Sequence, residues 1–400
     1  MQAVILVGGA GTRVKPASLS RPKPLIDICG KPFLYYLIKQ LEEAGFSNVL
    51  LLSGYLSQEF DRFVADYSKD FNLNLINHAT DADLNTGARV LQSVELISNR
   101  FLLLYGDNYL PFCLSWYVKT HWESKQNFIC AYDNNDSYSK SNITISDNDN
   151  LCIGYKDSNS RRTPSLTDIG YFLLNKHDFA NMKFDEDLHL GSDILKPLVK
   201  NKKLTINIIY QRYYSVGTMN RILGFRYFIS NQKKKYLLLD RDGIINEKPD
   251  KGKYVGDYHE FNWKEGTIPA LKKLKSYNFD FVIITNQAGV ARNMISEKKL
   301  DLLHNQICRK SREVKAELNY IYVCPHHWDE KCHCRKPEAG LLRDAAFDLG
   351  FDLSKVIFIG DSISDFQASE KVGSKFINLG PAQSLENFVQ EIEDYYNDYY

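Results

Sequence analysis

Residues 236–243 read YLLLDRDG, an apolar run that ends in two aspartates separated by a single residue. The apolar run predicts a buried strand, with Asp240 and Asp242 at its carboxyl end. Open sheets of parallel strands bind ligands outside these carboxyl ends, and side chains two residues apart on a strand point to the same side. The stretch therefore predicts an α/β domain with an acidic site, although a DxDG sequence by itself also suits an ordinary turn.

Similar apolar runs recur along the whole chain, with amphipathic segments between them. Residues 32–45, PFLYYLIKQLEEAG, have the apolar spacing of a helix that ends at a glycine. The regular alternation of strand and helix predicts two Rossmann-like α/β domains, each built on a doubly wound, mostly parallel sheet. The clearest strands are QAVILV (2–7), NVLLLSG (48–54), RFLLLYGD (100–107), LTINIIY (204–210), FDFVIITN (279–286), YIYVC (320–324), KVIFIGD (355–361) and KFINLG (375–380).

The length of the chain also predicts two domains, since 400 residues exceed what one compact core usually holds. We place the first domain at residues 1–229, a basic linker at 230–235 and the second domain at 236–383. An acidic, tyrosine-rich tail follows at 384–400. This tail is either a terminal helix that packs on the second domain or a loose end.

The composition is that of a globular protein, with 44% hydrophobic residues, 25% charged residues and a formal net charge of +1. Without a large basic field, we expect no nucleic-acid partner and no membrane surface. The apolar start of the chain is too short for a signal peptide, and no run approaches the ~20 apolar residues of a membrane span. These features predict a cytoplasmic protein with reduced thiols. Whether it forms a homo-oligomer stays open.

Three further signals accompany the aspartate pair in the second domain. The strand VIITN carries Thr285, the sequence CRKP offers Arg335 and Lys336, and the strand VIFIG ends at Asp361, with Asp365 beyond it. A dianionic phosphate needs fixed positive charge and a metal ion before a carboxylate can approach it. An acid pair, a hydroxyl, a cation and a further acid at strand ends therefore predict a magnesium-dependent phosphoryl transfer site.

Over residues 236–383 this constellation resembles the haloacid dehalogenase superfamily. The resemblance implies that Asp240 is the nucleophile, which becomes an aspartyl phosphate, and that Asp242 is the general acid and base. It also implies that Thr285 and Lys336 hold the phosphoryl oxygens. The expected magnesium ligands are Asp240, the backbone carbonyl of Asp242 and Asp361. We expect Arg335 in the catalytic site, and Asn286 and Gln287 in substrate binding.

Residues 324–337, CPHHWDEKCHCRKP, contain a Cys-x-His and a Cys-x-Cys pair. Cys324, His326, Cys332 and Cys334 form a four-ligand pattern typical of tetrahedral zinc, which leaves no open position and so indicates a structural ion. A disulfide fits poorly with a reducing compartment. His327 and His333 are spare candidates whose ordinary role is that of exposed loop residues.

Zinc loops of this kind occur in two branches of the superfamily, the heptose-bisphosphate phosphatases and the histidinol-phosphate phosphatases. LLLDRDGIIN (237–246), Tyr254-Val255 and TNQAGVAR (285–292) resemble the heptose branch more closely. The short spacer 327–331 is closer to many histidinol-phosphate enzymes. The chemistry is the same in both readings, and the substrate differs.

Residues 4–25 read VILVGGAGTRVKPASLSRPKPL, a strand followed by a glycine-rich turn and a Lys-Pro. The glycine spacing fits neither a dinucleotide fingerprint nor a Walker loop. Glycines let backbone amides approach a triphosphate, and arginine and lysine supply charge for the leaving pyrophosphate. The residues expected in this loop are Gly8, Gly9, Gly11, Thr12, Arg13 and Lys23.

The whole GGxGTR…KP string resembles the nucleotidyltransferases that make nucleotide sugars, over about residues 1–228. The resemblance implies that a sugar 1-phosphate attacks the α-phosphorus of a nucleoside triphosphate, a reaction that needs alignment and charge neutralisation but no covalent intermediate. It places Gly87 of LNTGARV at the base and Asp107 of LLLYGDN on Mg²⁺. The expected sugar-phosphate residues are Lys156, Asp168 and Gly170.

One position departs from this family. Many relatives carry a second metal-binding aspartate just before a late Gly-Thr, where this chain reads YYSVGTMN and has Ser215. Either the metal is held differently or this site is weakened. The alternative class is a first domain that binds nucleotide or sugar without catalysis.

The two resemblances fit together, because a heptose-bisphosphate phosphatase leaves a heptose 1-phosphate and a nucleotidyltransferase consumes a sugar 1-phosphate. We predict a bifunctional enzyme that makes a nucleotide-activated heptose, with small sugar phosphates and a nucleoside triphosphate as partners. GTP is favoured, since the first half most resembles the heptose 1-phosphate guanylyltransferases. The alternatives are another sugar phosphate or a histidinol-phosphate phosphatase. The anomer and the base are not legible from the sequence.

Overall fold

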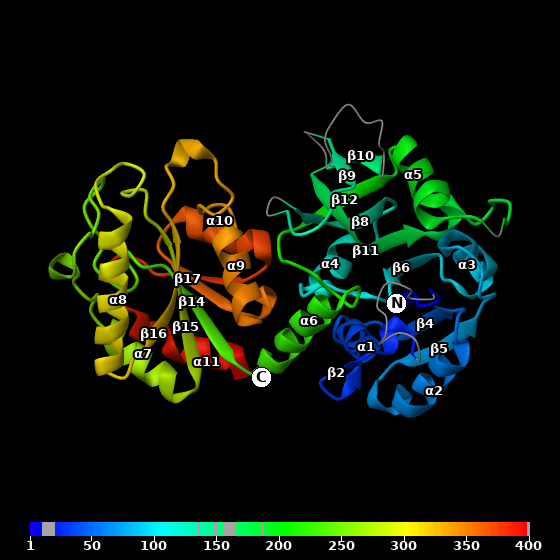
Figure 1. Ribbon diagram of the computed structural model, residues 1–400, viewed down its shortest axis with the longest axis horizontal. Helices are drawn as coiled ribbons and strands as arrows, with labels where there is room; N and C mark the ends of the chain where they lie inside the picture. The colour runs from blue at the N-terminus through cyan, green and yellow to red at the C-terminus, as the bar shows by residue number, and fades with distance from the viewer. Residues whose placement is uncertain (10–20, 135–136, 147–149, 156–164, 186, 398–400) are drawn as a thin grey trace. The chain divides into compact units, whose positions relative to one another are not determined.

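The computed structural model describes residues 1–9, 21–134, 137–146, 150–155, 165–185 and 187–397. It divides into two compact units, Met1–Tyr227 and Phe228–Tyr400 (Figure 1). Each unit is an α/β fold with its own mostly parallel sheet, as the strand and helix pattern predicts.

The first unit is built on a sheet whose described strands number nine, in the order β10-β9-β11-β6-β1-β4-β5, with β8 and β12 joined beside β11. Strands β1, β4, β5 and β6 run parallel, whereas β11 runs antiparallel to β6. The strands are β1 Gln2–Leu6, β2 Asp27–Ile28, β3 Lys31–Pro32, β4 Asn48–Ser53, β5 Asn74–Ala79, β6 Arg100–Tyr105, β7 Asn108–Tyr109, β8 Asn127–Asp133, β9 Ile143–Ile145, β10 Cys152–Tyr155, β11 Leu166–Asn175, β12 Leu204–Ile209 and β13 Tyr214–Ser215.

Helix α1 shows why the sequence folds this way locally. Pro32 precedes it, its apolar residues recur at helical spacing and are buried, and Gly45, with φ of 86°, follows its end. A left-handed residue at that place suits glycine, which has no Cβ to clash. The helices of this unit are α1 Phe33–Glu43, α2 Ser57–Tyr67, α3 Thr86–Gln92, α4 Leu114–His121, α5 Lys196–Lys200 and α6 Met219–Asn231, which continues into the second unit.

The order of strands in the first unit locates its binding edge. Strand β1 lies inside the sheet, with β4 and then β5 on one side of it and β6 on the other. The order of the strands reverses between β1 and β6, and such a switch point opens a crevice at the carboxyl ends of the strands. Gly8 follows β1 and Asp107 follows β6, so both lie at this edge.

The second unit has a parallel sheet in the order β16-β15-β14-β17-β18. Its switch point lies between β14 and β17, the strands that lead to Asp240 and Asp361. Figure 1 shows α8 on one side of these strands and α9 with α10 on the other. The elements are β14 Lys235–Leu239, β15 Phe279–Asn286, β16 Leu318–Cys324, β17 Ile357–Gly360, β18 Lys375–Asn378, α7 Thr267–Ser276, α8 Glu297–Glu313, α9 Gly340–Leu349, α10 Ile363–Val372 and α11 Val389–Asn397.

The tail resolves the choice that the sequence left open. Residues 389–397 form α11, which buries Val389, Ile392 and Tyr396. The Tyr396 hydroxyl accepts a hydrogen bond from the backbone N–H of Ile357 at 3.0 Å and donates one to the carbonyl of Tyr236. The tail is therefore a terminal helix that ties β14 to β17. Residues 232–234, between the end of α6 and the start of β14, fall within the predicted linker 230–235.

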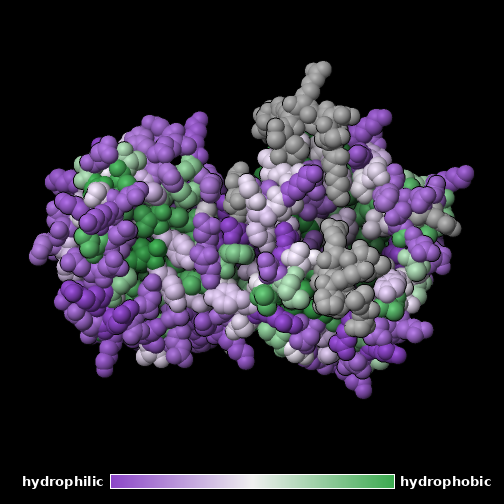
Figure 2. All heavy atoms as spheres, viewed as in Figure 1, coloured by the Kyte–Doolittle hydropathy of each residue, from purple (hydrophilic) through white to green (hydrophobic). Residues whose placement is uncertain are grey.

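Figure 2 shows hydrophilic side chains over most of the surface that faces the viewer, with hydrophobic atoms in patches between them. Within the described ranges, no helix has both the length and the apolar character needed to cross a membrane.

Candidate active sites

The acidic edge of the second unit is organised around one buried lysine. Lys336 is 3% exposed, and its Nζ lies 2.8 Å from Asp240 Oδ1, 2.6 Å from Asp365 Oδ1 and 2.8 Å from the carbonyl of Ile284. Burial raises the pKa of Asp240, and the attraction of Lys336 opposes this. Burial also acts to lower the pKa of Lys336, but the two carboxylates keep it raised. A charged lysine thus stands beside the expected nucleophile.

Carboxylates of Asp240, Asp361 and Asp365 converge here, with one oxygen of each within 4.8 Å of the others. Mg²⁺ prefers such oxygen ligands. Asp365 also accepts hydrogen bonds through Oδ2 from the backbone N–H and the hydroxyl of Ser362, at the start of α10. With its other oxygen on Lys336, Asp365 positions the lysine. Asp240 and Asp361 remain as the carboxylates suited to magnesium.

Gly243 shows how tightly this edge is built. Its φ is +95°, and a Cβ on it would lie 2.1 Å from Asp361 Oδ2. Only glycine therefore fits after the second aspartate of the DxDG sequence. Asp361 forms an ion pair with Lys248, whose Nζ lies 2.8 Å from the same oxygen, Oδ2, and whose side chain is 58% exposed.

Asp242 sits in a separate cradle of donors. Fully buried Arg241 contacts its carboxylate at 2.9, 3.0 and 3.2 Å, and Asn246 and Gln287 donate to it at 3.0 and 2.8 Å. Burial acts to raise the pKa of Asp242, but the charge of Arg241 and these hydrogen bonds hold it below its ordinary value. The carboxylate is thereby fixed in place and favoured in its charged form, that of a base.

The cradle has a further layer, in which His304 of α8 contacts Arg241. Arg241 Nη1 lies 3.1 Å from His304 Nε2. Because a guanidinium has only donors, Nε2 must accept, and the ring is neutral. Burial, followed by the repulsion of Arg241, lowers the pKa of His304 to about 3.

The other residues expected in this site take different positions. Thr285 is 1% exposed and accepts a hydrogen bond from Gln287 Nε2 at 2.9 Å. Asn286 clamps the backbone of Lys336, accepting from its N–H at 3.1 Å and donating to its carbonyl at 3.0 Å. Arg335 donates to the carbonyl of His326 at 3.3 Å. Asn286 and Gln287 thus hold catalytic candidates in place, whereas Arg335 contacts the cysteine loop.

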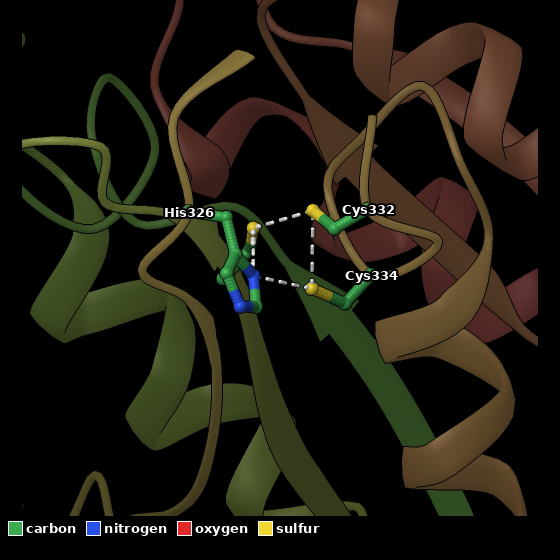
Figure 3. Close-up of side chains that lie close together, drawn as sticks. His326, Cys332 and Cys334 are labelled. Carbon is green, nitrogen blue, oxygen red and sulfur yellow. Dashed lines mark hydrogen bonds between the residues drawn. The ribbon is translucent and has the colours of Figure 1, made fainter. Parts of the chain in front are cut away.

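Cys324, His326, Cys332 and Cys334 converge at the end of β16, as Figure 3 shows for the labelled three. Neighbouring ligand atoms lie 3.1 to 3.6 Å apart. Ligands of a tetrahedral zinc–thiolate site are about 3.8 Å apart, since each Zn–S bond is ~2.3 Å, and a disulfide needs ~2.05 Å. All three cysteines are free thiols. The four residues therefore fit a tetrahedral metal ion.

Electrostatics within the cluster agree with this fit. Hydrogen bonding between Cys324 and Cys334 lowers the pKa of Cys324 and raises that of Cys334, so one of the two thiols is favoured as the thiolate, the form that binds metals. The two spare histidines lie outside the cluster. The ring of His327 contacts that of Trp328 in a tilted arrangement, with centroids 3.8 Å apart. His333 is exposed, and its carbonyl accepts a hydrogen bond from the N–H of Gly340.

The first unit holds a cavity of about 640 Å³ at its switch point. Gly8, Gly9 and Lys23 line one part of it, and Asp107 lines another. Gly11, Thr12, Arg13 and Lys156 lie outside the described residues. The segment 82–86 forms a further wall. Gly87 is not among the lining residues and instead packs on the backbone of 188–190, where a Cβ would come within 2.8 Å.

Arg89 forms the floor of this cavity and was not expected from the sequence. It is 4% exposed, and its guanidinium donates to the carbonyls of Ser53, Ala82 and Leu84 and to the Thr80 hydroxyl. It fills the space beside Gly8 and Gly54, where a Cβ would come within 2.4 and 2.2 Å of it. Arg89 therefore ties the ends of β1, β4 and β5 to the wall 82–86.

Asp168 and Gly170 lie on β11, next to the Asp107 side of the cavity. Asp168 accepts from the Tyr155 hydroxyl at 2.5 Å and from the N–H of Gly170 at 2.8 Å. Asn108 Nδ2 donates to the carbonyl between them, that of Ile169, at 3.0 Å. The expected sugar-phosphate residues thus adjoin the strand that follows Asp107.

Comparison with known proteins follows the two-unit division. The nucleotidyl transferase family matches residues 2–232, and the polynucleotide kinase 3 phosphatase family matches residues 235–376. The D-glycero-alpha-D-manno-heptose-1,7-bisphosphate 7-phosphatase of Photorhabdus laumondii subsp. laumondii is 34% identical over 152 residues, which are 36% of this chain and 81% of that relative. The D-glycero-beta-D-manno-heptose-1,7-bisphosphate 7-phosphatase of Haemophilus influenzae is 37% identical over 147 residues, covering 35% of this chain and 77% of that relative.

Two solved structures are also similar. The D,D-heptose 1.7-bisphosphate phosphatase of B. bronchiseptica, complexed with magnesium and phosphate, is 28% identical, covers 40% of this chain and 98% of its own, and has a TM-score of 0.38. HddC of Yersinia pseudotuberculosis, complexed with GMP-PN, is 21% identical, covers 56% and 96%, and has a TM-score of 0.46.

The matched ranges and the two units agree in placing a different enzyme family in each half of the chain. The chain belongs to the nucleotidyl transferase family, and its second unit belongs to the heptose-1,7-bisphosphate 7-phosphatases, so two enzymes are fused in one polypeptide.

Proposed function

We propose that this chain removes the C7 phosphate of a heptose 1,7-bisphosphate and then transfers a nucleotidyl group, from GTP, to the resulting heptose 1-phosphate. The observation that carries the proposal is the contact of Lys336 with Asp240 at the switch point of a unit whose relatives are heptose-bisphosphate phosphatases. The fused nucleotidyl transferase family supports the second step, because the product of one reaction is a substrate of the other.

In the phosphatase step, Asp240 attacks the phosphorus, and the bond from phosphorus to the C7 oxygen breaks as the aspartyl phosphate forms. Lys336 and the Thr285 hydroxyl stabilise the charge on the phosphoryl oxygens. The negative charge of the bound phosphate favours protonation of Asp242, which gives this proton to the leaving alkoxide. Asp242 then takes a proton from the water that attacks the aspartyl phosphate.

Magnesium, held by Asp240 and Asp361, would neutralise phosphate charge in this site. Lys248, which pairs with the same oxygen of Asp361, is exposed enough to move aside or to turn toward the substrate. We assign zinc to the Cys324, His326, Cys332 and Cys334 cluster as a structural ion, since four protein ligands leave no position for a reacting water. The metal loop leads directly into Arg335 and Lys336, so its order helps to place the lysine.

In the nucleotidyl step, an oxygen of heptose 1-phosphate attacks the α-phosphorus of the nucleotide, and pyrophosphate leaves. Asp107, which follows β6 and lines the cavity, would hold a magnesium ion that neutralises charge on the nucleotide phosphates. The carboxylate of Asp83 in the cavity wall suits guanine, because only guanine presents two adjacent donors, N1–H and N2–H, that a carboxylate can accept together. Lys23 supplies charge for the leaving pyrophosphate.

A pair of reciprocal variants tests this function. Asp240→Asn keeps the shape but cannot form the aspartyl phosphate, so phosphate release from heptose 1,7-bisphosphate should fall at least about 10³-fold, or ~4 kcal/mol in barrier. The same protein should still release pyrophosphate from heptose 1-phosphate and GTP at close to the normal rate. Asp107→Asn is the matched control and should show the opposite pattern.

The outcomes separate the alternatives. Loss of both activities in folded Asp240→Asn would mean that the two units form one catalytic centre. Absence of pyrophosphate release from wild-type protein, despite nucleotide binding, would favour a non-catalytic first domain. Phosphate release from histidinol phosphate but not from the heptose bisphosphate would assign the other substrate branch.

A further inference from the structure

Gln287 is a fully buried side chain that contacts two different working groups of the second unit. Its Nε2 lies 2.8 Å from Asp242 Oδ2 and 2.9 Å from the hydroxyl oxygen of Thr285. A charged carboxylate only accepts hydrogen bonds, so the atom that faces Asp242 must be the nitrogen, and the orientation of the amide is fixed. The amide nitrogen carries two hydrogens, and each of them has its own acceptor.

The second of these hydrogen bonds determines the direction of the Thr285 hydroxyl. A hydroxyl has one hydrogen and two lone pairs, and Gln287 donates to one of the lone pairs. The hydroxyl hydrogen must therefore point away from the amide. In the part of the chain that the structure describes, no group accepts a hydrogen bond from Thr285, so its hydrogen is available to a bound substrate.

Thr285 lies at the edge of the sheet where the nucleophile lies. Strand β15 runs parallel to β14 and beside it, so Thr285 and Asp240 are at the same carboxyl edge. Lys336 Nζ, which contacts Asp240, also contacts the carbonyl of Ile284, the residue before Thr285. The hydroxyl and the lysine are therefore two neighbouring donors at the place where a phosphoryl group would bind.

Stability alone does not explain an amide at position 287. Gln287 Oε1 is buried and has no hydrogen-bond partner among the described residues. A buried acceptor without a partner costs about 1–3 kcal/mol, a cost that an apolar side chain of similar shape would avoid. The backbone is held as well, because the N–H of Gln287 donates to the carbonyl of Cys324 at 2.7 Å. The amide is thus a fixed group whose two donors are both in use.

We propose that Gln287 is a positioning residue of the phosphatase, which directs the hydroxyl hydrogen of Thr285 at a phosphoryl oxygen while it holds Asp242. This role rests on the proposed phosphatase step, in which Thr285 stabilises charge on the phosphoryl oxygens. One nitrogen then sets both the group that binds the phosphate and the group that moves the proton.

A double-mutant cycle with Thr285 tests this role, with Asn246 as the matched control. Asn246 is also a fully buried amide that donates to Asp242, at 3.0 Å, but it has no hydrogen bond with Thr285. Gln287→Met keeps the length of the side chain and removes its donors. It should lower kcat/KM for heptose 1,7-bisphosphate at least about tenfold more in the wild-type background than in the Thr285→Val background. Asn246→Leu should have the same effect in both backgrounds, to within about threefold.

Equal effects of Gln287→Met in the two backgrounds would overturn the proposal, since a side chain that only supports the fold lowers activity with or without the hydroxyl. If Gln287→Met does not fold, as judged by urea unfolding, Gln287→Asn replaces it in the cycle. Its side chain is one methylene shorter and cannot reach both acceptors. Full activity of Gln287→Asn would also contradict the role of the two donors.

A wrong sugar assignment gives a different pattern. If wild-type protein releases no phosphate from heptose 1,7-bisphosphate, the proposed function fails, and calorimetric binding of tungstate, an inert phosphate mimic, still tests Gln287 with magnesium present. Tungstate bound by the first unit contributes equally to all variants. Gln287→Met and Thr285→Val should each weaken binding at least about tenfold, and the double variant less than about threefold further. Unchanged binding by Gln287→Met, or additive losses, would refute the proposed direction of the hydroxyl.

Discussion

Replacing His304 by glutamine should remove part of the pH dependence of stability in the second unit. In the folded state the pKa of His304 is lowered to about 3 by burial and by Arg241, against an ordinary value of 6.5. The unfolded chain therefore binds a proton more readily than the folded chain. Stability from this group is complete above pH 6.5 and is lost as the pH falls from 6.5 toward about 3.

The magnitude follows from the two pKa values. Between about pH 7.5 and about pH 5.5 the unfolded state gains most of one proton while His304 in the folded state stays neutral. The free energy of unfolding should fall by about 1.4 kcal/mol from this residue alone. Glutamine does not titrate, and its amide oxygen can still accept a hydrogen bond from Arg241.

The assay is urea unfolding of the full chain at both pH values, with hydrogen exchange of β14 peptides reporting the second unit. Other titrating groups contribute equally to both proteins, so the difference between the two pH slopes isolates His304. If His304→Gln loses as much stability as wild type on acidification, the hypothesis that His304 is neutral and accepts a hydrogen bond from Arg241 is wrong.

Three further changes test other parts of the fold and sites. Cys332→Ser should lose bound zinc and destabilise the second unit while nucleotidyl transfer persists. Cys308→Ser, which lies outside the cluster, should retain the metal, and elemental analysis that finds no zinc in wild type would refute the assignment. Arg89→Met should raise the KM for GTP about tenfold by releasing the cavity wall, and Arg89→Lys should recover little, since lysine lacks the planar fork of donors. Tyr396→Phe leaves a buried N–H and carbonyl without their partner and should cost ~1–3 kcal/mol in denaturant unfolding; no measurable cost would mean that α11 is not docked on the sheet.

Much of the fold could be read from local pattern. The predicted strand 279–286 has the same first and last residues as β15. Strands β1, β4 and β14 each differ from the predicted strand by one residue at one end. Strands buried on both faces are continuous apolar runs in the sequence, so hydrophobicity alone marks them. The structure of the tail could not be predicted in this way. A short amphipathic segment docks only if a matching surface exists, and that surface is formed by strands that are distant in the sequence.

The site could be predicted where residues follow a strand or share a short motif. Asp240 and Lys336 are 96 positions apart, yet each belongs to a recognisable motif, and they meet at 2.8 Å. Asp365 was visible one helical turn beyond Asp361, but its contact with Lys336 depends on how α10 starts. The contact of Arg335 with the carbonyl of His326 likewise depends on the path of the loop.

The sequence by itself determined the two α/β domains, the chemistry of the DxDG and cysteine motifs, and the absence of an acid at position 215. Only the tertiary structure decided what stands behind them: Arg241 with His304 under one aspartate, and Arg89 between two glycines. These are single residues without periodicity, and a lone arginine or histidine reads as an ordinary surface residue. Their roles come from long-range packing that buries a charge beside particular acceptors, and no local pattern encodes which distant strand ends will supply those acceptors.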